Sequence, residues 1–166
     1  MSDTSSISIS ALVQQLAAKL LAKNLIMATA ESCTGGCIAQ SLTAVAGSSN
    51  WFDSGFVTYS NAAKQRLLNV PAELFASNGP GAVSEAVVLA MTAGAIANSR
   101  ANVAVAVSGI AGPDGGTEEK PVGTVWIAWQ YENKSLARCF HFKGDRGAVR
   151  KATAHAALEG SLLLVG

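Results

Sequence analysis

Apolar residues at helical spacing mark five segments of the chain as helices. In the first, Leu12, Leu16 and Leu20 repeat every four residues, and Asn24 provides a stop signal. Ser60, Ser84 and Asp145 each precede an apolar periodic segment, in the position that a helix N-cap occupies. The expected helices cover residues 11–24, 34–45, 60–70, 84–99 and 146–165.

Short runs of apolar, β-branched and aromatic residues alternate with these helices and predict five strands, at 25–30, 51–59, 102–109, 124–131 and 135–142. Residues 102–109 are almost continuously apolar, a pattern typical of a strand in a parallel sheet that is covered on both faces. The last two strands are joined by a short turn and form a hairpin.

Because helices and strands interleave, the pattern predicts an α/β fold: a three-layer α/β/α sandwich with a mixed, mostly parallel sheet and a late antiparallel hairpin. The length of 166 residues suits one domain, 1–166, in which residues 1–9 are expected to be a frayed N-terminal end.

The charge of the chain restricts its partners. Twelve basic and 11 acidic residues give a formal charge of +1, so no overall field attracts nucleic acid or an acidic membrane surface. No apolar run approaches the roughly 20 residues that span a bilayer. We therefore expect neither nucleic acid nor a membrane as a partner. The low charge and the apolar helix at 84–99 favour a homodimer or a higher homo-oligomer.

Cysteine usage indicates a reducing compartment. Cys33, Cys37 and Cys139 form no CxxC pair, and the N-terminus has no secretory signal pattern, so we expect free thiols in a cytoplasmic protein. His141 and His155 lack the spacing of zinc ligands, and no metal site is expected.

The stretch "ATAESCTGGC", residues 28–37, places Ser32 and Cys33 after a predicted strand and before a predicted helix. Ligands of open α/β sheets bind at the carboxyl ends of strands, and a helix N-terminus offers N–H groups to an oxyanion or phosphate. Gly35 and Gly36 would let a ligand approach the backbone. The alternative is structural: Ser32 or Thr34 caps the helix. The stretch alone leaves both interpretations open.

The stretch "TYSNAAK" places Tyr59 at the end of a strand and Lys64 one turn into a helix. A cation near a helix N-terminus is disfavoured by roughly 0.3–1 kcal/mol. With burial, this effect would shift the lysine towards the neutral form that a general base needs. An ordinary solvated lysine is the alternative.

A long glycine-rich loop and two arginines could together hold an anion. The loop follows the strand at 102–109, and its consecutive N–H groups could bind a phosphate, although it matches neither a P-loop nor a dinucleotide motif. Arg146 and Arg150 are spaced i, i+4 on one helix face, where they could close on a phosphate. A surface loop and a solvated helix face are the alternatives.

The segments "AESCTGG", "YSNAAKQRLLNV", "AVSGIAGPDGGTEEKPVGTVWIA" and "GDRGAVR", in this order, resemble the CinA C-terminal-domain family over residues 10–164. The resemblance implies a nicotinamide-nucleotide amidase, which converts nicotinamide mononucleotide to nicotinate mononucleotide and ammonia without a cofactor or metal. Larger family members carry an additional N-terminal domain related to molybdopterin-binding proteins, and the resemblance is to the stand-alone form.

The resemblance also implies residue roles. It makes Ser32, rather than Cys33, the nucleophile and Lys64 the base, with Tyr59 assisting proton transfer or positioning. Arg146 would bind the phosphate, and N–H groups at the helix start would stabilise the oxyanion. The full set of expected substrate-binding residues is Thr34, Gly35, Gly36, Ser108, Gly109, Gly112, Gly115, Gly116, Thr117, Arg146 and Arg150.

Two other hypotheses belong to different classes. One is a non-catalytic nucleotide-binding or regulatory module of the same fold, which would keep the pocket without turnover. The other is a cysteine hydrolase that uses Cys33, although no histidine is placed by spacing to activate its thiol.

Overall fold

Five strands form one mixed sheet in the order β2-β1-β3-β4-β5. The computed structural model describes residues 6–166. β1 pairs in parallel with β2 and β3, whereas β4 pairs antiparallel with β3 and β5. The strands are β1 (Met27–Glu31), β2 (Phe52–Val57), β3 (Val103–Gly109), β4 (Thr124–Tyr131) and β5 (Lys134–His141).

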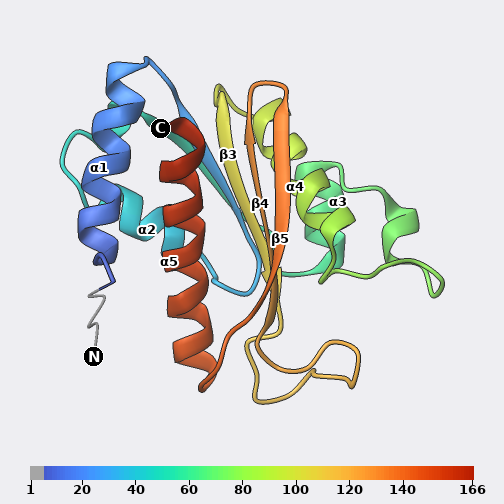
Figure 1. Cartoon of the computed structure of the whole chain (residues 1–166). Helices are drawn as coiled ribbons and strands as arrows, with labels where there is room; N and C mark the ends of the chain where they lie inside the picture. Colours follow the sequence, from blue (N-terminus) through green and yellow to red (C-terminus); the bar gives the residue numbers. More distant parts are fainter. Residues whose placement is uncertain (1–5) are drawn as a thin grey trace.

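Helices cover both faces of this sheet, with α1, α2 and α5 on one side and α3 and α4 on the other (Figure 1). The predicted α/β fold class is confirmed, with two parallel and two antiparallel ladders in the sheet. The α-helices are α1 (Ile9–Ala22), α2 (Cys37–Thr43), α3 (Asn61–Leu68), α4 (Glu85–Ala97) and α5 (Arg146–Val165). Two short 3₁₀ turns are η1 (Ser48–Asn50) and η2 (Ala72–Phe75).

The three predicted N-caps are confirmed. At Ser60, Ser84 and Asp145 the side-chain oxygen accepts a hydrogen bond from the backbone N–H three residues further on. Each such cap contributes about 1 kcal/mol of helix stability. The caps therefore set where α3, α4 and α5 begin, and two of these helices carry side chains of the candidate site.

Two predicted helix starts are wrong, and the predicted ends of α1 to α4 lie two residues too far along the chain. α1 begins at Ile9 rather than residue 11, because the Ser8 hydroxyl accepts from the N–H of Ala11. The end expected to fray is thus shorter than 1–9, and residues 1–5 lie outside the described part. α2 begins at Cys37 rather than residue 34, because Gly35 and Gly36 have φ angles of +62° and +104°, outside the helical region.

The central strand β3 explains how the sheet packs on both faces. Its valines at 103, 105 and 107 are fully buried in the cluster formed with α1 and α5, while Ala104 and Ala106 are fully buried on the α4 side. This alternation follows from the two-residue period of a strand. A strand packed on both faces holds its carboxyl end, Ser108 and Gly109, in a fixed position.

No helix within residues 6–166 combines the length and the apolar character needed to cross a bilayer. In the same part of the chain, no three His, Cys, Asp or Glu side chains gather as a metal site requires.

Candidate active site

A cavity of about 280 Å³ opens where the carboxyl ends of β1, β2 and β3 meet the start of α5. The carboxyl end of β3 and the segments that follow β1 and β2 contribute to its wall Ser32, Cys33, Tyr59, Asn61, Lys64, Ser108 and Gly109. Other loops and α5 add Ala82, Val83, Ile110, Ala111, Gly112, Asp114, Gly115 and Arg146. The cavity therefore collects residues from all four of the segments that the sequence singled out.

Ser32 and Lys64 are in direct contact inside this cavity. Lys64 Nζ donates a hydrogen bond to Ser32 Oγ over 2.9 Å, and also to the backbone oxygens of Thr58 at 2.9 Å and Tyr59 at 3.2 Å. Lys64 is 1% exposed and Ser32 7%. The alternative of an ordinary solvated lysine is therefore wrong.

Burial lowers the pKa of Lys64 to about 8, because the charged ammonium loses most of its hydration in this position. Once the ammonium gives up one proton, its two remaining hydrogens match the carbonyls of Thr58 and Tyr59. The lone pair then faces the Ser32 hydroxyl. This is the arrangement of a general base next to a nucleophile.

Cys33 lies beside Ser32 in the cavity wall, but its chemistry is unfavourable. Burial, the largest effect, raises the pKa of the Cys33 thiol to about 11, so the reactive thiolate is scarce near neutral pH. Neither histidine is placed to activate it: His155 contacts the backbone oxygen of Ile7, and His141 contacts Thr124. The structure thus disfavours Cys33 as the nucleophile.

Glu31 is a site residue that sequence reasoning missed. Its carboxylate is fully buried and accepts hydrogen bonds from Thr34 Oγ1 at 2.7 Å and from the N–H groups of Ile38 at 2.9 Å and Ala39 at 3.0 Å. Glu31 therefore caps α2, and neither Ser32 nor Thr34 does. The available signal was an acidic residue just before a helix N-terminus, where a negative charge is favoured.

Several expected substrate-binding residues do not line the cavity. Thr34 is buried against Glu31, and Gly35 and Gly36 serve the left-handed turn that leads into α2. Gly116 and Thr117 also lie outside the wall, and Thr117 closes a local turn with Lys120 through two hydrogen bonds. Ser108, Gly109, Gly112 and Gly115 do line it.

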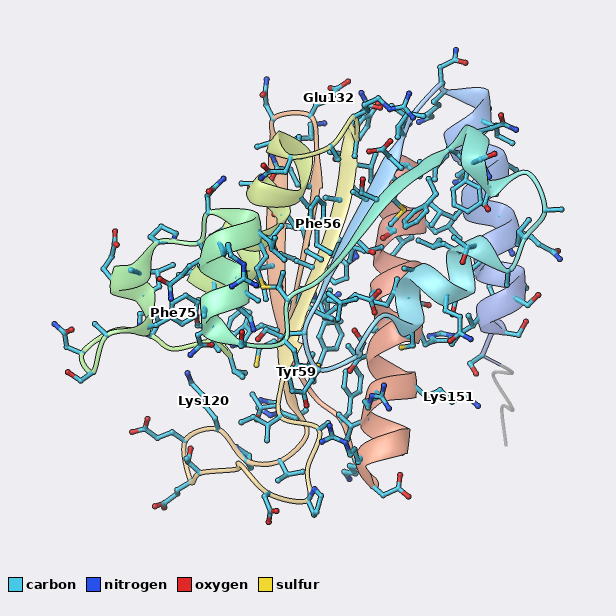
Figure 2. The ribbon with its side chains drawn as sticks, turned by 180° about the vertical axis from the view of Figure 1, so that it is seen from behind. Phe56, Tyr59, Phe75, Lys120, Glu132 and Lys151 are labelled. Carbon is cyan, nitrogen blue, oxygen red and sulfur yellow. The ribbon has the colours of Figure 1, made fainter. Side chains whose placement is uncertain are left out.

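Tyr59 and Arg146 meet at the mouth of the cavity. Arg146 donates from Nη2 to the Tyr59 hydroxyl over 3.0 Å and from Nη1 to the backbone oxygen of Gly112 over 2.8 Å. Tyr59, which is 61% exposed, lies between the glycine-rich loop and the first turn of α5 (Figure 2). Its hydroxyl faces Arg146, whereas its backbone oxygen contacts Lys64.

Arg150 takes a different position from Arg146, although the two are one helical turn apart. Its Nε donates to the backbone oxygen of Cys33 and its Nη2 to that of Thr34, both at 3.1 Å. Arg150 does not line the cavity. The i, i+4 spacing predicted a shared helix face, but it could not predict that the two side chains would have different partners.

Comparisons with known proteins identify relatives along nearly the whole described chain. The model of the CinA C-terminal domain family matches residues 9–164. The nicotinamide-nucleotide amidohydrolase PncC of Pseudomonas putida is 54% identical over 94% of this chain and 96% of its own. The PncC of Escherichia coli K12 is 52% identical over 87% and 88%. The crystal structure of a competence/damage inducible protein from Agrobacterium tumefaciens superposes with a TM-score of 0.90 at 45% identity, covering 95% and 94% of the two chains.

Proposed function

The chain belongs to the CinA C-terminal domain family, and we propose that it is an amidase that converts nicotinamide mononucleotide to nicotinate mononucleotide and ammonia. Relatives that are 52–54% identical over most of their length carry the name nicotinamide-nucleotide amidohydrolase. The observation that carries the proposal is the buried contact of 2.9 Å between Lys64 Nζ and Ser32 Oγ in the wall of the cavity.

The proposed reaction has two steps. Neutral Lys64 takes the proton of the Ser32 hydroxyl, and Oγ attacks the carboxamide carbon of the nicotinamide ring. The tetrahedral intermediate collapses, the C–N bond breaks, and the proton held by Lys64 leaves with the amine as ammonia. Water then attacks the Ser32 ester while Lys64 accepts its proton, and this proton returns to Ser32 Oγ as nicotinate mononucleotide leaves.

The oxyanion of the tetrahedral intermediate needs N–H donors that are not already hydrogen-bonded to another acceptor. The N–H groups of Ile38 and Ala39, at the start of α2, are bound to the Glu31 carboxylate. The backbone N–H of Cys33 donates to no other residue among residues 6–166, and Cys33 lines the cavity directly after the proposed nucleophile. We assign the oxyanion to this N–H; one such donor typically contributes about 10²–10³ in rate.

Arg146 is the proposed phosphate ligand, with Tyr59 as its positioning partner. Both line the cavity, and the guanidinium stands at its mouth with hydrogen bonds to only two acceptors. Guanidinium groups bind phosphate through charge-assisted, often bidentate, hydrogen bonds. In this pose the carboxamide lies at Ser32 and the phosphate at Arg146. The ribose, which joins the nicotinamide ring to the phosphate, spans the space between them.

A cytoplasmic location and a homo-oligomeric state are further proposals. Cys33, Cys37 and Cys139 are all free thiols, as a reducing compartment would leave them. Sedimentation of the purified protein measures the oligomeric state directly.

Ammonia release from nicotinamide mononucleotide, nicotinamide riboside and NAD tests the proposed function. We expect the mononucleotide to be the best substrate, because the riboside lacks the phosphate and NAD carries an adenylate that extends beyond it. Tight binding of the mononucleotide without ammonia release from any of the three would instead support the nucleotide-binding module.

A further inference from the structure

The turn that carries the nucleophile is held from two sides. Residues 32–36 connect β1 to α2, and two short-range backbone hydrogen bonds lie within residues 32–37. Gly35 N–H donates to Ser32 O over 3.0 Å, and Cys37 N–H donates to Thr34 O over 3.2 Å. The entry to the turn is fixed by Ser32 N–H, which donates to Val107 O of β3 over 3.1 Å. A turn with so few internal bonds depends on its surroundings for its shape.

Glu31 holds the inner side of this turn. Its buried carboxylate joins the Thr34 hydroxyl to the first free N–H groups of α2, at Ile38 and Ala39. The carboxylate has no cationic partner among the described residues, so these three hydrogen bonds are its compensation for burial. The Glu31 side chain therefore links the turn that begins at Ser32 to the first turn of α2.

Arg150 holds the outer side. Its guanidinium donates to two consecutive backbone oxygens, Cys33 O and Thr34 O, each at 3.1 Å. A planar trans peptide points its N–H opposite to its C=O, so each bound oxygen also fixes the orientation of the next N–H. With Ser32 N bound to Val107 and Cys33 O bound to Arg150, both ends of the Ser32–Cys33 unit are fixed.

We propose that Arg150 is a positioning residue, which together with Glu31 clamps the turn so that Ser32 Oγ stays at Lys64 and the Cys33 N–H stays in the cavity wall. The effect of Arg150 on turnover rests on the proposed function, whereas its effect on the structure of the turn does not. Arg146 lines the cavity and can contact a substrate there, whereas Arg150 does not line it and contacts the turn instead. Geometric accuracy at this point matters, since a misplacement of about 1 Å can cost about 10²-fold in rate.

The kinetic test compares Arg150→Met with Arg146→Gln and with Lys151→Met, which removes an exposed cation from the next position of α5 (Figure 2). On both the mononucleotide and the riboside, we expect Arg150→Met to lower kcat about 10–100-fold with KM within about twofold. Arg150→Lys, which can still bind one of the two oxygens, should recover part of kcat. A raised KM for the mononucleotide alone would make Arg150 a phosphate ligand and overturn the proposal.

A second readout does not depend on any substrate. Hydrogen exchange of the amides between residues 32 and 39 should become about tenfold faster in Arg150→Met, because the two charge-assisted bonds that hold the turn are lost. Arg146→Gln and Lys151→Met should leave this segment as in the unsubstituted protein. Unchanged exchange in Arg150→Met would refute the clamp, whereas a failure of the proposed amidase activity would appear as absent turnover in the unsubstituted protein.

Discussion

Lys64 Nζ lies 2.9 Å from Ser32 Oγ, although 32 positions separate the two residues in the chain. The contact forms because β1 and β2 are neighbours in the sheet and run in parallel, so their carboxyl ends lie together. Ser32 follows β1 directly, and Lys64 lies one turn into α3, which Ser60 caps soon after β2. The proposed catalytic pair thus results from the strand order and one helix cap.

The pH dependence of the reaction should follow Lys64. Burial lowers its pKa to about 8, and the neutral form is the proposed base, so kcat/KM should rise with pH and reach half of its plateau at about pH 8. At pH 7 the value should be about a tenth of the plateau, since about one lysine in eleven is then neutral. Steady-state ammonia release between pH 6 and 10 measures this. A flat profile would rule out a lysine base with this pKa.

Lys64→Met should abolish activity and stabilise the fold at neutral pH. The pKa of Lys64 is about 8 in the folded chain and near 10.5 when unfolded, so below pH 8 the buried charge costs about 3 kcal/mol, before the loss of its hydrogen bonds is counted. Between pH 8 and 10.5 the folded chain has lost the Lys64 proton while the unfolded chain still holds it, so stability rises with pH. Above this range the cost of burying the charge is gone. Denaturant unfolding should therefore show a gain for Lys64→Met at pH 7 that shrinks towards pH 10.5. A gain that is independent of pH would contradict this origin.

Arg146→Gln should weaken recognition of the phosphate. Hydrogen bonds to charged groups contribute about 1.5–3 kcal/mol, so kcat/KM for nicotinamide mononucleotide should fall about 10–100-fold, mainly through KM. The riboside, which has no phosphate, serves as the control substrate and should be affected much less. An equal loss on both substrates would show that Arg146 does not discriminate by the phosphate.

Most of the fold could be predicted because its signals are local. The caps at Ser60, Ser84 and Asp145 and the apolar strand at 102–109 each depend on neighbours in the chain. The start of α2 could not be predicted from propensity, because the left-handed φ angles at Gly35 and Gly36 are visible only in the folded turn.

The residues of the site likewise divide into those that local sequence indicates and those that only tertiary contacts bring to the site. Spacing alone left the choice between Ser32 and Cys33 open, and the family resemblance selects Ser32. The contact between Ser32 Oγ and the buried Lys64 gives a physical reason for this choice. Glu31 contacts residues only 3 to 8 positions away, so its role had a local signal in the sequence. Arg150 reaches the turn across 116 and 117 positions, and no local sequence pattern indicates such contacts.

Gly94→Ala should destabilise the fold and disturb the site. A Cβ at Gly94 of α4 would overlap the backbone oxygen of Leu68, at the end of α3, so the two helices would have to move apart. We expect a loss of about 1–3 kcal/mol, as for other overpacked positions, and lower activity because α3 carries Lys64. Gly147→Ala is the control: it adds the same methyl group at an exposed helix position, with no atom closer than 3.5 Å. Thermal unfolding of both variants tests this, and equal melting temperatures would be inconsistent with the overlap.

Ammonia release from nicotinamide mononucleotide by Ser32→Ala and Cys33→Ala, measured side by side with the unsubstituted protein, decides whether Ser32 is the nucleophile. The two residues are adjacent and both line the cavity, so each variant controls for general disturbance of the turn. The account predicts no release above background from Ser32→Ala and substantial release from Cys33→Ala. Full activity of Ser32→Ala, or a loss confined to Cys33→Ala, would contradict it.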